Sequence, residues 1–309
     1  MSALRRARRA LFFVARRIAL AVRPLAIISA VCASPATAHG IVGDRFFPAT
    51  ITTDDPAVAD ELSLPTVDTF PTADDPSDRQ VDISGEYSKR LTSRLGISFD
   101  GAWTEIKTPG APSVAGFQNL GTTIKYQAIT NVPHELMVSV GLDVEWGGTG
   151  NARIGADRTT ALTPTLYFGK GAGDLPASLS WAKPFALTGV IGYSVPLKAG
   201  EPRVLQTGFA LEYSFRYLSS HVRDVGLPRF VNQLTPLVEV SLASPMANGG
   251  GPRTGTINPG VLWSGQHMQL GAEAIVPINA ASGHGVGAVF QVHWFLDDLF
   301  PHSIGRPIW

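Results

Sequence analysis

Apolar and polar residues alternate with a period of two along most of the chain. In the stretch 136–146, one row of side chains is aliphatic and ends in Trp146, while the opposite row carries Asp143 and Glu145. Such alternation indicates a β-strand whose two faces meet different environments. The pattern predicts strands at residues 79–90, 95–104, 119–128, 136–146, 159–170, 185–198, 204–219, 230–244, 254–263, 267–279 and 285–297. Prolines within these stretches must lie at a bulge, at a strand end or where pairing is interrupted; they are Pro164, Pro236, Pro259 and Pro277.

The predicted strands favour a membrane-spanning barrel over a soluble sandwich. Many exceed the roughly five or six residues typical of soluble sheets and match a tilted crossing of a bilayer. Their apolar rows carry aromatic residues near the ends, as at a lipid interface; these are Tyr87, Trp103, Tyr126, Trp146, Tyr217, Trp263 and Trp294. The opposite rows are small residues with scattered charges, which a dry sandwich core would leave unpaired at a cost on the order of several kcal/mol each. The sequence therefore predicts an all-β fold, a transmembrane antiparallel up-and-down β-barrel.

Connection lengths predict the orientation and the number of strands. Tight connections at 130–133 and 264–266 alternate with a Gly-rich connection at 147–157. Outer-membrane barrels have short periplasmic turns and longer external loops, so the tight connections are assigned to the periplasmic side. Bacterial barrels have an even number of strands, so a further strand is expected upstream, within residues 62–70. The predicted total is about twelve strands, with about ten as the alternative.

The last predicted strand, 285–297, has one face suited to lipid and one suited to a lumen. The lipid row runs from Val286 to Leu296 and is apolar, whereas the lumen row runs from Gly287 to Phe295 and contains His293. The barrel domain is assigned to 79–300. Pro301 and Pro307 prevent regular strand pairing in the residues that follow, so 301–309 is predicted to be a C-terminal tail.

Residues 1–38 predict a signal peptide for export. An arginine-rich region precedes a short apolar run at 25–33, and Ala36-Thr37-Ala38 fits a cleavage site after Ala38. The only cysteine, Cys32, falls inside this segment, so the mature chain has no thiol for a disulfide, a nucleophile or a metal site. Export of a cysteine-free barrel indicates the outer membrane of a Gram-negative bacterium.

Composition sets residues 39–78 apart from the rest. The whole chain is 44% hydrophobic and 16% charged, which argues against disorder. Its 25 acidic and 25 basic residues balance, so the chain has no net charge that would attract nucleic acid. Residues 39–78 are instead rich in Asp, Pro and Thr. Two interpretations stay open: an extended linker, or a segment docked into the lumen or mouth of the barrel that could also supply its first strand.

The inward rows provide candidate lumen-lining residues. They are Asp82, Glu86, Asp100, Lys125, Asp143, Glu145, Glu212, Arg216, Glu239, Glu273 and His293. Because carboxylates predominate, a pore with this lining would favour cations and repel anions. The alternative is that these carboxylates are paired or hydrogen-bonded inside a filled barrel. A barrel of about twelve strands lies between the filled and the channel-forming sizes, so both hypotheses remain open.

No motif predicts a catalytic, cofactor or metal site. Residues 169–173 are glycine-rich like a phosphate-binding loop, but no long helix follows, and 177–182 predicts only a short helical turn. The histidines contain no metal-binding pair, and no G-x-S-x-G elbow is present. A Ser/His/Asp arrangement across strands is kept as an alternative. The chain is expected to need no cofactor and not to be an enzyme.

Five stretches resemble a family of proteobacterial outer-membrane β-barrels of unsettled function. They are GDRFFP at 43–48, DDPAVADELSLP at 54–65, GKGAGDLP at 169–176, TINPG at 256–260 and WFLDDLF at 294–300. This family is in turn similar to the outer-membrane proteins of the phenol meta-cleavage pathway, which are associated with uptake of hydrophobic compounds. The resemblance implies a barrel and transport, and it carries over no catalytic residue.

The combined prediction is an outer-membrane channel or uptake protein for small molecules, which the resemblance extends to hydrophobic or aromatic ones. The alternatives are a barrel enzyme acting on lipid and a structural or interaction barrel with a plugged lumen. The expected partners are outer-membrane lipid, the barrel-assembly machinery and a small-molecule solute, and nucleic acid is not among them.

Overall fold

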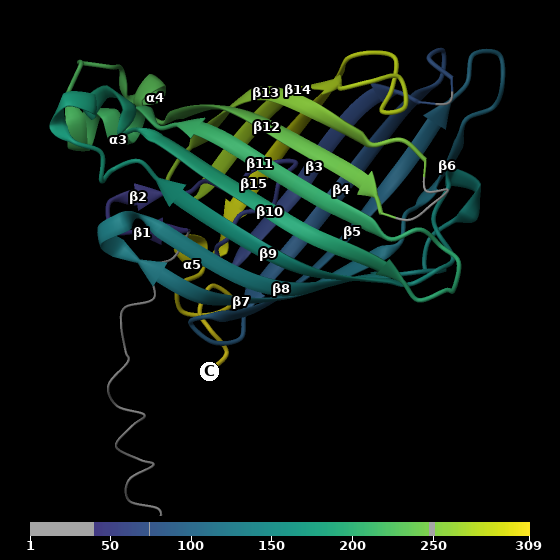
Figure 1. Ribbon diagram of the computed structural model, residues 1–309, viewed down its shortest axis with the longest axis horizontal. Coiled ribbons are helices and arrows are strands. Elements are labelled where there is room, and N and C mark those ends of the chain that lie inside the picture. The colour runs from purple at the N-terminus through teal and green to yellow at the C-terminus, as the bar shows by residue number, and fades with distance from the viewer. Residues whose placement is uncertain (1–39, 74, 247–250) are drawn as a thin grey trace, which may run out of the picture. The chain divides into compact units, whose positions relative to one another are not determined.

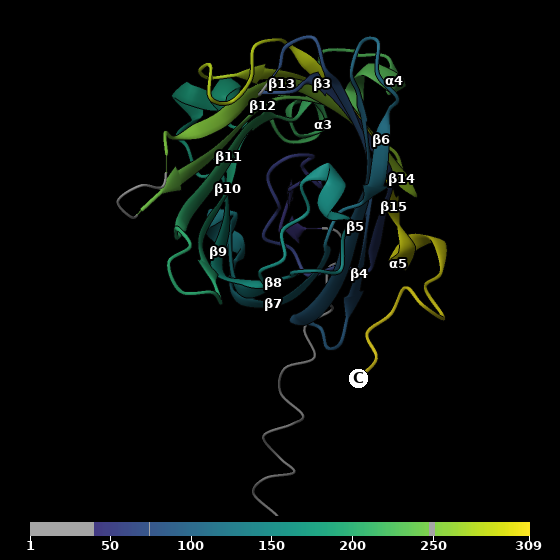
Figure 2. The ribbon, with the colours of Figure 1, turned by 90° about the vertical axis from the view of Figure 1, so that its right-hand side faces the viewer.

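Long antiparallel strands form a closed ring (Figures 1 and 2). The computed structural model describes residues 40–73, 75–246 and 251–309, so the predicted signal peptide lies outside the described residues. The ring strands are β3 (Glu61–Pro71), β4 (Arg79–Arg90), β5 (Leu95–Lys107), β7 (Leu120–Asn131), β8 (Leu136–Trp146), β9 (Ala161–Gly171), β10 (Phe185–Pro196), β11 (Val204–Tyr213), β12 (Leu234–Pro245), β13 (Thr254–Ser264), β14 (Met268–Pro277) and β15 (Gly287–Phe295).

Each ring strand pairs with its neighbours in the chain, and β15 closes the ring by pairing with β3. A short strand, β6 (Val114–Phe117), pairs only with the last part of β5 and does not belong to the ring. The prediction of a closed antiparallel barrel of twelve strands is confirmed, and the alternative of ten is wrong. The region expected to supply the extra strand, 62–70, lies within β3.

Short helices and the connections occupy the two ends of the barrel. One end, here called the turn end, carries η1 (Val132–His134), η3 (Ala177–Ala182), α3 (Phe215–Tyr217), η4 (Leu218–Val222), α4 (Arg229–Asn232) and α5 (Leu296–Leu299). The opposite loop end carries η2 (Ala152–Ile154). The predicted short helical turn at 177–182 is η3. Connections at the turn end are not all short, since 172–184 and 214–233 also lie there.

Within residues 40–73, 75–246 and 251–309, no helix is long and apolar enough to cross a membrane.

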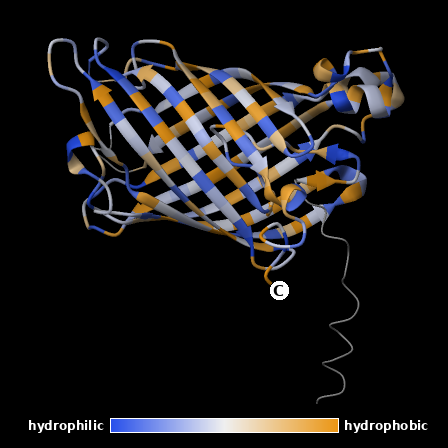
Figure 3. Ribbon diagram, turned by 180° about the vertical axis from the view of Figure 1, so that it is seen from behind, coloured by the Kyte–Doolittle hydropathy of each residue, from blue (hydrophilic) through white to orange (hydrophobic). Residues whose placement is uncertain are grey.

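Hydrophobic and hydrophilic residues alternate along the strands (Figure 3). On β15, Phe290 is 58% exposed, whereas Gln291 and His293 on the other face are buried. The exposed outward residues of the ring strands form an extended apolar surface; they include Ile83, Phe99, Leu120, Ile124, Tyr126, Val140, Leu142, Trp146, Leu166, Leu187, Ile191, Leu211, Val238, Ile257, Val261 and Leu270. An apolar surface of this extent is typical of a barrel that meets lipid.

Prolines interrupt the pairing where the sequence predicted that they must. The pairing of β9 with β10 skips the positions beside Pro164, and the pairing of β13 with β14 skips those beside Pro259. The β11–β12 pairing ends next to Pro236, and Pro277 is the last residue of β14. Because proline has no N–H to donate, each interruption costs the sheet little.

Three details of the predicted strands are wrong. The strand predicted over 204–219 ends at Tyr213, because the Ser214 hydroxyl accepts a hydrogen bond from the Tyr217 N–H and starts α3. Arg216 therefore lies in α3 at the turn end and not in a lumen row, and Tyr217 is buried and not part of an outward aromatic row. The strand predicted from 230 begins only after α4. Leu296 is buried at the start of α5 and does not extend the lipid row of β15.

The C-terminal residues return to the turn end of β4. The backbone N–H groups of Ile308 and Trp309 donate to the carbonyls of Arg90 and Leu91. The Lys89 ammonium donates to two carbonyls of the same tail, at Ile304 and Arg306. The tail thus has fixed contacts, although it adds no strand to the ring.

The outward surface predicts a position-dependent cost for charge. Leu142 lies near the middle of β8 and is 40% exposed, so Leu142→Arg should destabilise the barrel in a bilayer by about 2–4 kcal/mol. The matched control is Val225→Arg, because Val225 is similarly exposed at 49% but lies outside every strand. Denaturant unfolding of both variants in lipid vesicles measures the difference. Equal, small effects would contradict lipid contact at Leu142.

Candidate functional site

Residues 40–60, here called the lumen segment, occupy the turn-end mouth and the interior of the ring of strands (Figures 1 and 2). They begin with a small hairpin of β1 (Ile41–Val42) and β2 (Arg45–Phe46) at the turn end. The chain then runs into the lumen and returns to the turn end, where β3 begins. Within this segment, Thr53 and Asp54 contact Glu239 of β12 and Lys125 of β7.

Arg45 anchors the entrance of the lumen segment and is 1% exposed. Its guanidinium donates from Nε to Glu135 Oε2 at 3.0 Å and from Nη1 and Nη2 to the carbonyls of Pro184 and Lys183. The guanidinium also lies 3.8 Å from the centre of the Tyr217 ring. A buried charge is tolerated only with partners of this number and quality, so Arg45 fixes the hairpin to the turn end.

Glu135 joins this anchor to the turns around it. Its carboxylate accepts hydrogen bonds from the Tyr217 hydroxyl at 2.7 Å and from the Gly173 N–H at 2.9 Å. Burial, together with the bond to Glu135, raises the pKa of Tyr217 to about 12, so the phenol keeps the proton that it donates. Glu135 has a positive φ of 46°, and its contacts hold this residue in the left-handed region.

Glu239 holds the deepest part of the lumen segment. Its carboxylate oxygens accept hydrogen bonds from the backbone N–H groups of Ile51, Thr52 and Thr53 at 2.6–3.0 Å, and from the Thr52 hydroxyl at 2.8 Å. These backbone groups have no strand to pair with, so the carboxylate replaces a sheet partner. Glu239 is fully buried, and its inward position on β12 is required for this contact.

Glycines on the inward rows leave room for the lumen segment. A Cβ on Gly271 would lie 2.5 Å from the Ile51 side chain, and one on Gly208 would lie 2.9 Å from Thr53. Both distances are too short for real atoms, so a larger residue there would force the Ile51 or Thr53 side chain to shift. Glycine at these two positions therefore lets the lumen segment pack closely against the sheet.

A second charged cluster lies on the other side of the lumen. The Lys125 ammonium lies 2.7 Å from an Asp54 carboxylate oxygen and 4.3 Å from the centre of the Tyr167 ring. The Tyr167 hydroxyl donates to Asp143 at 2.8 Å. The Lys125 ammonium of β7 thus joins the lumen segment to Tyr167 of β9, which in turn is bonded to Asp143 of β8.

Asp60 anchors the exit of the lumen segment and has no exposed surface. Its carboxylate accepts from Lys89 Nζ at 2.5 Å and from Arg90 Nε at 2.7 Å, and it also accepts from the Arg90 N–H. The Asp60 carbonyl accepts from the Leu296 N–H. This anchor joins the start of β3 to β4 and to the residues after β15.

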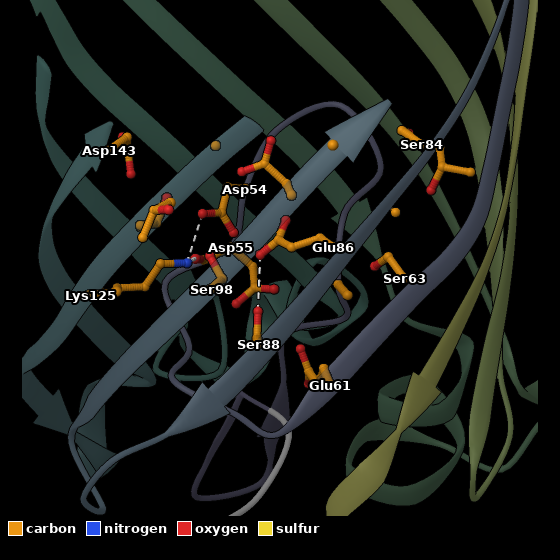
Figure 4. A pocket seen from close by; sticks show the side chains of 18 of the residues that line it. Asp54, Asp55, Glu61, Ser63, Ser84, Glu86, Ser88, Ser98, Lys125 and Asp143 are labelled. Carbon is orange, nitrogen blue, oxygen red and sulfur yellow. Dashed lines mark hydrogen bonds and ion pairs between the residues drawn. The ribbon is translucent and has the colours of Figure 1, made fainter. Parts of the chain in front are cut away.

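A cavity of about 610 Å³ lies in the lumen beside the lumen segment (Figure 4). Its lining is dominated by carboxylates and hydroxyls; the charged and titratable members are Asp54, Asp55, Glu61, Glu86, Lys89, Asp100, Lys125, Asp143, Glu145 and His293. Both lysines already contact carboxylates, Lys89 with Asp60 and Lys125 with Asp54. The cavity therefore presents an excess of negative charge to any solute that enters it.

The structure places the predicted lumen residues in several groups. Six line the cavity: Glu86, Asp100, Lys125, Asp143, Glu145 and His293. Asp82 accepts hydrogen bonds from Gln80 and Thr104. Glu212 accepts from Thr188, Glu239 holds the lumen segment, and Glu273 is buried on β14. Arg216 lines a different cavity of about 740 Å³ at the turn end.

Several residues of the cavity were missed from the sequence, among them Asp54, Asp55, Glu61 and Ser63. These four lie in the region 39–78, where apolar and polar residues do not alternate regularly, so the sequence did not indicate which side chains face inwards. The acidic pair Asp54 and Asp55 was visible as a composition signal, but nothing local indicated that it enters a lumen. No group of three or more potential metal ligands occurs among the residues that the structure describes.

Comparisons with known proteins concern the fold. No protein-family model matches the chain, and no curated protein matches its sequence. Solved structures do match: a KdgM porin has 10% identity and a TM-score of 0.44, with 74% of this chain and 98% of the porin covered. A NanC porin has 10% identity and a TM-score of 0.46, with 75% and 98% covered. LpxR from Salmonella typhimurium has 12% identity and a TM-score of 0.43, with 76% and 99% covered.

The Glu239 contacts predict which substitution weakens the hydrogen bonds that hold the lumen segment in place. Glu239→Gln removes the charge that strengthens the bonds from Ile51, Thr52 and Thr53, at a cost of about 1–3 kcal/mol. Amide exchange at these three residues should therefore become roughly 10–100-fold faster, while exchange in the ring strands stays unchanged. Hydrogen exchange read by mass spectrometry or NMR tests this.

The matched control for that experiment is Glu145→Gln. Glu145 also lies in the lumen, but its carboxylate accepts a hydrogen bond from the side chain of Asn119 and not from the lumen segment. Unchanged exchange at Ile51–Thr53 in Glu239→Gln, or the same acceleration in Glu145→Gln, would contradict the role of Glu239.

Proposed function

We propose that this protein is an outer-membrane channel for small, polar, preferably cationic solutes, and that the lumen segment closes it. The observation that carries the proposal is the carboxylate-rich cavity inside a barrel with an apolar outer surface. The outer surface suits lipid, and the interior suits a hydrated, charged solute. The turn end, which carries both the entrance of the lumen segment and the C-terminal tail, is assigned to the periplasm.

The chemistry of the lining decides the proposed class of solute. A hydrophobic or aromatic compound, as the sequence resemblance implies, would have to displace water from Glu86, Asp100 and Glu145 without replacing their hydrogen bonds. A cation gains from the same carboxylates instead. The proposal therefore keeps transport and replaces the hydrophobic solute with a cationic one.

The lumen segment is proposed to be the barrier to passage. Its contacts with Glu239 of β12, Lys125 of β7 and Arg90 of β4 come from different sides of the ring, so it crosses the lumen and does not merely line one wall. A barrel permanently closed in this way would be structural, which is the competing function. The two functions differ in what happens when the segment is removed.

Removing residues 39–57 should open the channel. The deletion keeps Asp60 and its ion pairs, so the start of β3 stays anchored. In planar bilayers, the refolded mature chain should show little conductance, and the deletion variant should show steady conductance that is several-fold higher. Heat-modifiable migration of both proteins on gels controls for folding. No conductance from a folded deletion variant would favour the structural barrel.

The carboxylates should set the selectivity of the opened channel. Each carboxylate within about 4 Å of a passing cation contributes about 1 kcal/mol in water-like surroundings. Glu86→Gln combined with Asp100→Asn, made in the deletion variant, should therefore lower the cation-to-anion permeability ratio by about five-fold or more. The reversal potential in a salt gradient measures this ratio.

Asp224→Asn supplies the control for selectivity. Asp224 is exposed, lies between η4 and α4, and is not part of the cavity lining. Its neutralisation should leave the reversal potential unchanged. A selectivity unaffected by the Glu86 and Asp100 changes would contradict the proposed cation preference.

A further inference from the structure

Three side chains of β3 and β15 form a Ser–His–Glu array in the lumen. The Ser63 hydroxyl lies 2.8 Å from His293 Nδ1, and His293 Nε2 lies 3.3 Å from a Glu61 carboxylate oxygen. All three residues line the carboxylate-rich cavity, and Figure 4 shows Glu61 and Ser63 on one strand beside it. A hydroxyl in contact with an imidazole whose other nitrogen meets a carboxylate is the arrangement that activates a serine as a nucleophile.

An irregularity in β3 produces this alignment. Gln291 pairs with Thr66, but His293 pairs with Ser63, so the register slips between them. The same slip occurs on the other side of β3, between Ser63 and Thr66 in the pairing with β4. The extra residue lies at Leu64–Pro65, and Leu64 is 48% exposed on the outer surface. Without the bulge, the residue opposite His293 would be Leu64 and not Ser63.

The array is enclosed but open to a small molecule. His293 is 3% exposed, so its imidazole is held by its neighbours and not by water. Ser63 and Glu61 are only partly buried, and both face a cavity of about 610 Å³. A volume in the range of about 300–1,000 Å³ is typical of sites for small molecules.

We propose that Ser63, His293 and Glu61 form a hydrolytic site in the lumen that cleaves small carboxylic esters carrying a positive charge. This activity goes beyond the channel function and does not depend on passage through the barrel. Ser63 is the nucleophile, His293 is the general base and then the general acid, and Glu61 orients the imidazole and stabilises its protonated form. The ring nitrogens have the opposite assignment to that of the chymotrypsin-type triad, with Nδ1 on the serine and Nε2 on the carboxylate.

The proposed reaction balances with water as the only co-reactant. Ser63 Oγ forms a bond to the ester carbonyl carbon while its proton passes to His293 Nδ1. The bond from the carbonyl carbon to the alcohol oxygen then breaks, and the alcohol leaves with the proton from Nδ1. Water attacks the acyl-serine, gives one proton to Nδ1 and releases the carboxylic acid, and the proton returns to Ser63 Oγ.

The charge of the cavity selects the substrate class. Asp54, Glu86 and Asp100 line the same cavity as Ser63, so a positively charged alcohol portion is attracted towards the array. An anionic ester of similar size is repelled. The carboxylate product is repelled as well, which favours its release.

The test uses the refolded mature chain in detergent, where transport plays no part. Acetylcholine serves as the cationic ester and acetylsalicylate as the anionic one, with acid release followed at constant pH. The expected result is faster hydrolysis of acetylcholine. A fluorophosphonate probe, which reacts with activated serines, is expected to label Ser63 when the peptides are mapped by mass spectrometry.

Variants separate chemistry from structure. Ser63→Ala should abolish hydrolysis and labelling, and His293→Gln should lower both by about 100-fold or more, the lower range for general-base catalysis. Ser77→Ala is one control, because Ser77 donates to Asp75 at the loop end and is not part of the cavity lining. Ser220→Ala is a second control, since Ser220 contacts His221 outside this cavity.

Both controls should keep the activity of the unmodified chain. The proposal is overturned if the unmodified, folded chain neither hydrolyses acetylcholine nor takes up the probe. It is also overturned if Ser63→Ala retains both, or if the probe labels Ser77 or Ser220 instead of Ser63.

Discussion

The buried backbone of the lumen segment must find hydrogen-bond partners inside the barrel, and the rest of the interior is arranged around that need. The ring strands use their own N–H and C=O groups to close the sheet, so they have none left for a chain in the lumen. Side chains supply the partners instead. Glu239 accepts hydrogen bonds from three consecutive N–H groups of the segment. The Ser139 hydroxyl donates to the Pro56 carbonyl, and the Gln269 amide donates to the Ala49 carbonyl. The segment is thus held by polar contacts that could be exchanged for water.

The same barrel divides its carboxylates between two tasks. Glu135, Glu239 and Asp60 are buried and saturated by bonds to the lumen segment or to the residues that anchor it. Asp100 and Glu145 instead face the cavity, where the proposed channel function has them attract a cationic solute. Lys125 lies between the two sets, because it pairs with Asp54 of the segment and also lines the cavity. A change in the position of the segment therefore changes the charge that the cavity presents.

The period-two pattern was sufficient to predict most of the barrel, because each strand has one apolar and one polar face. It predicted the phase of β15, in which Gln291 and His293 face inwards. It failed where a local contact overrides periodicity, as at Ser214, whose hydroxyl caps α3 and ends β11. It also could not predict the lumen segment's position, since that depends on contacts such as Thr52 to Glu239, which are 187 residues apart. The Ser63–His293 contact was missed for a related reason: the bulge at Pro65 changes the register that a regular pattern would give.

The backbone does not couple closure of the lumen to the Ser–His–Glu array, because Asp60 separates the two. Asp60 is held by Lys89 and Arg90 of β4, and its carbonyl accepts from the Leu296 N–H after β15. Movement of the residues before Asp60 therefore need not shift Glu61, which pairs with Phe295 as the first residue of β3. If the segment left the lumen, its carboxylate Asp54 would leave with it, whereas Glu61, Ser63 and His293 would stay in place on the sheet. Opening would then widen access to the array and weaken its attraction for cations at the same time, so the two proposed activities would be coupled through charge and not through the backbone.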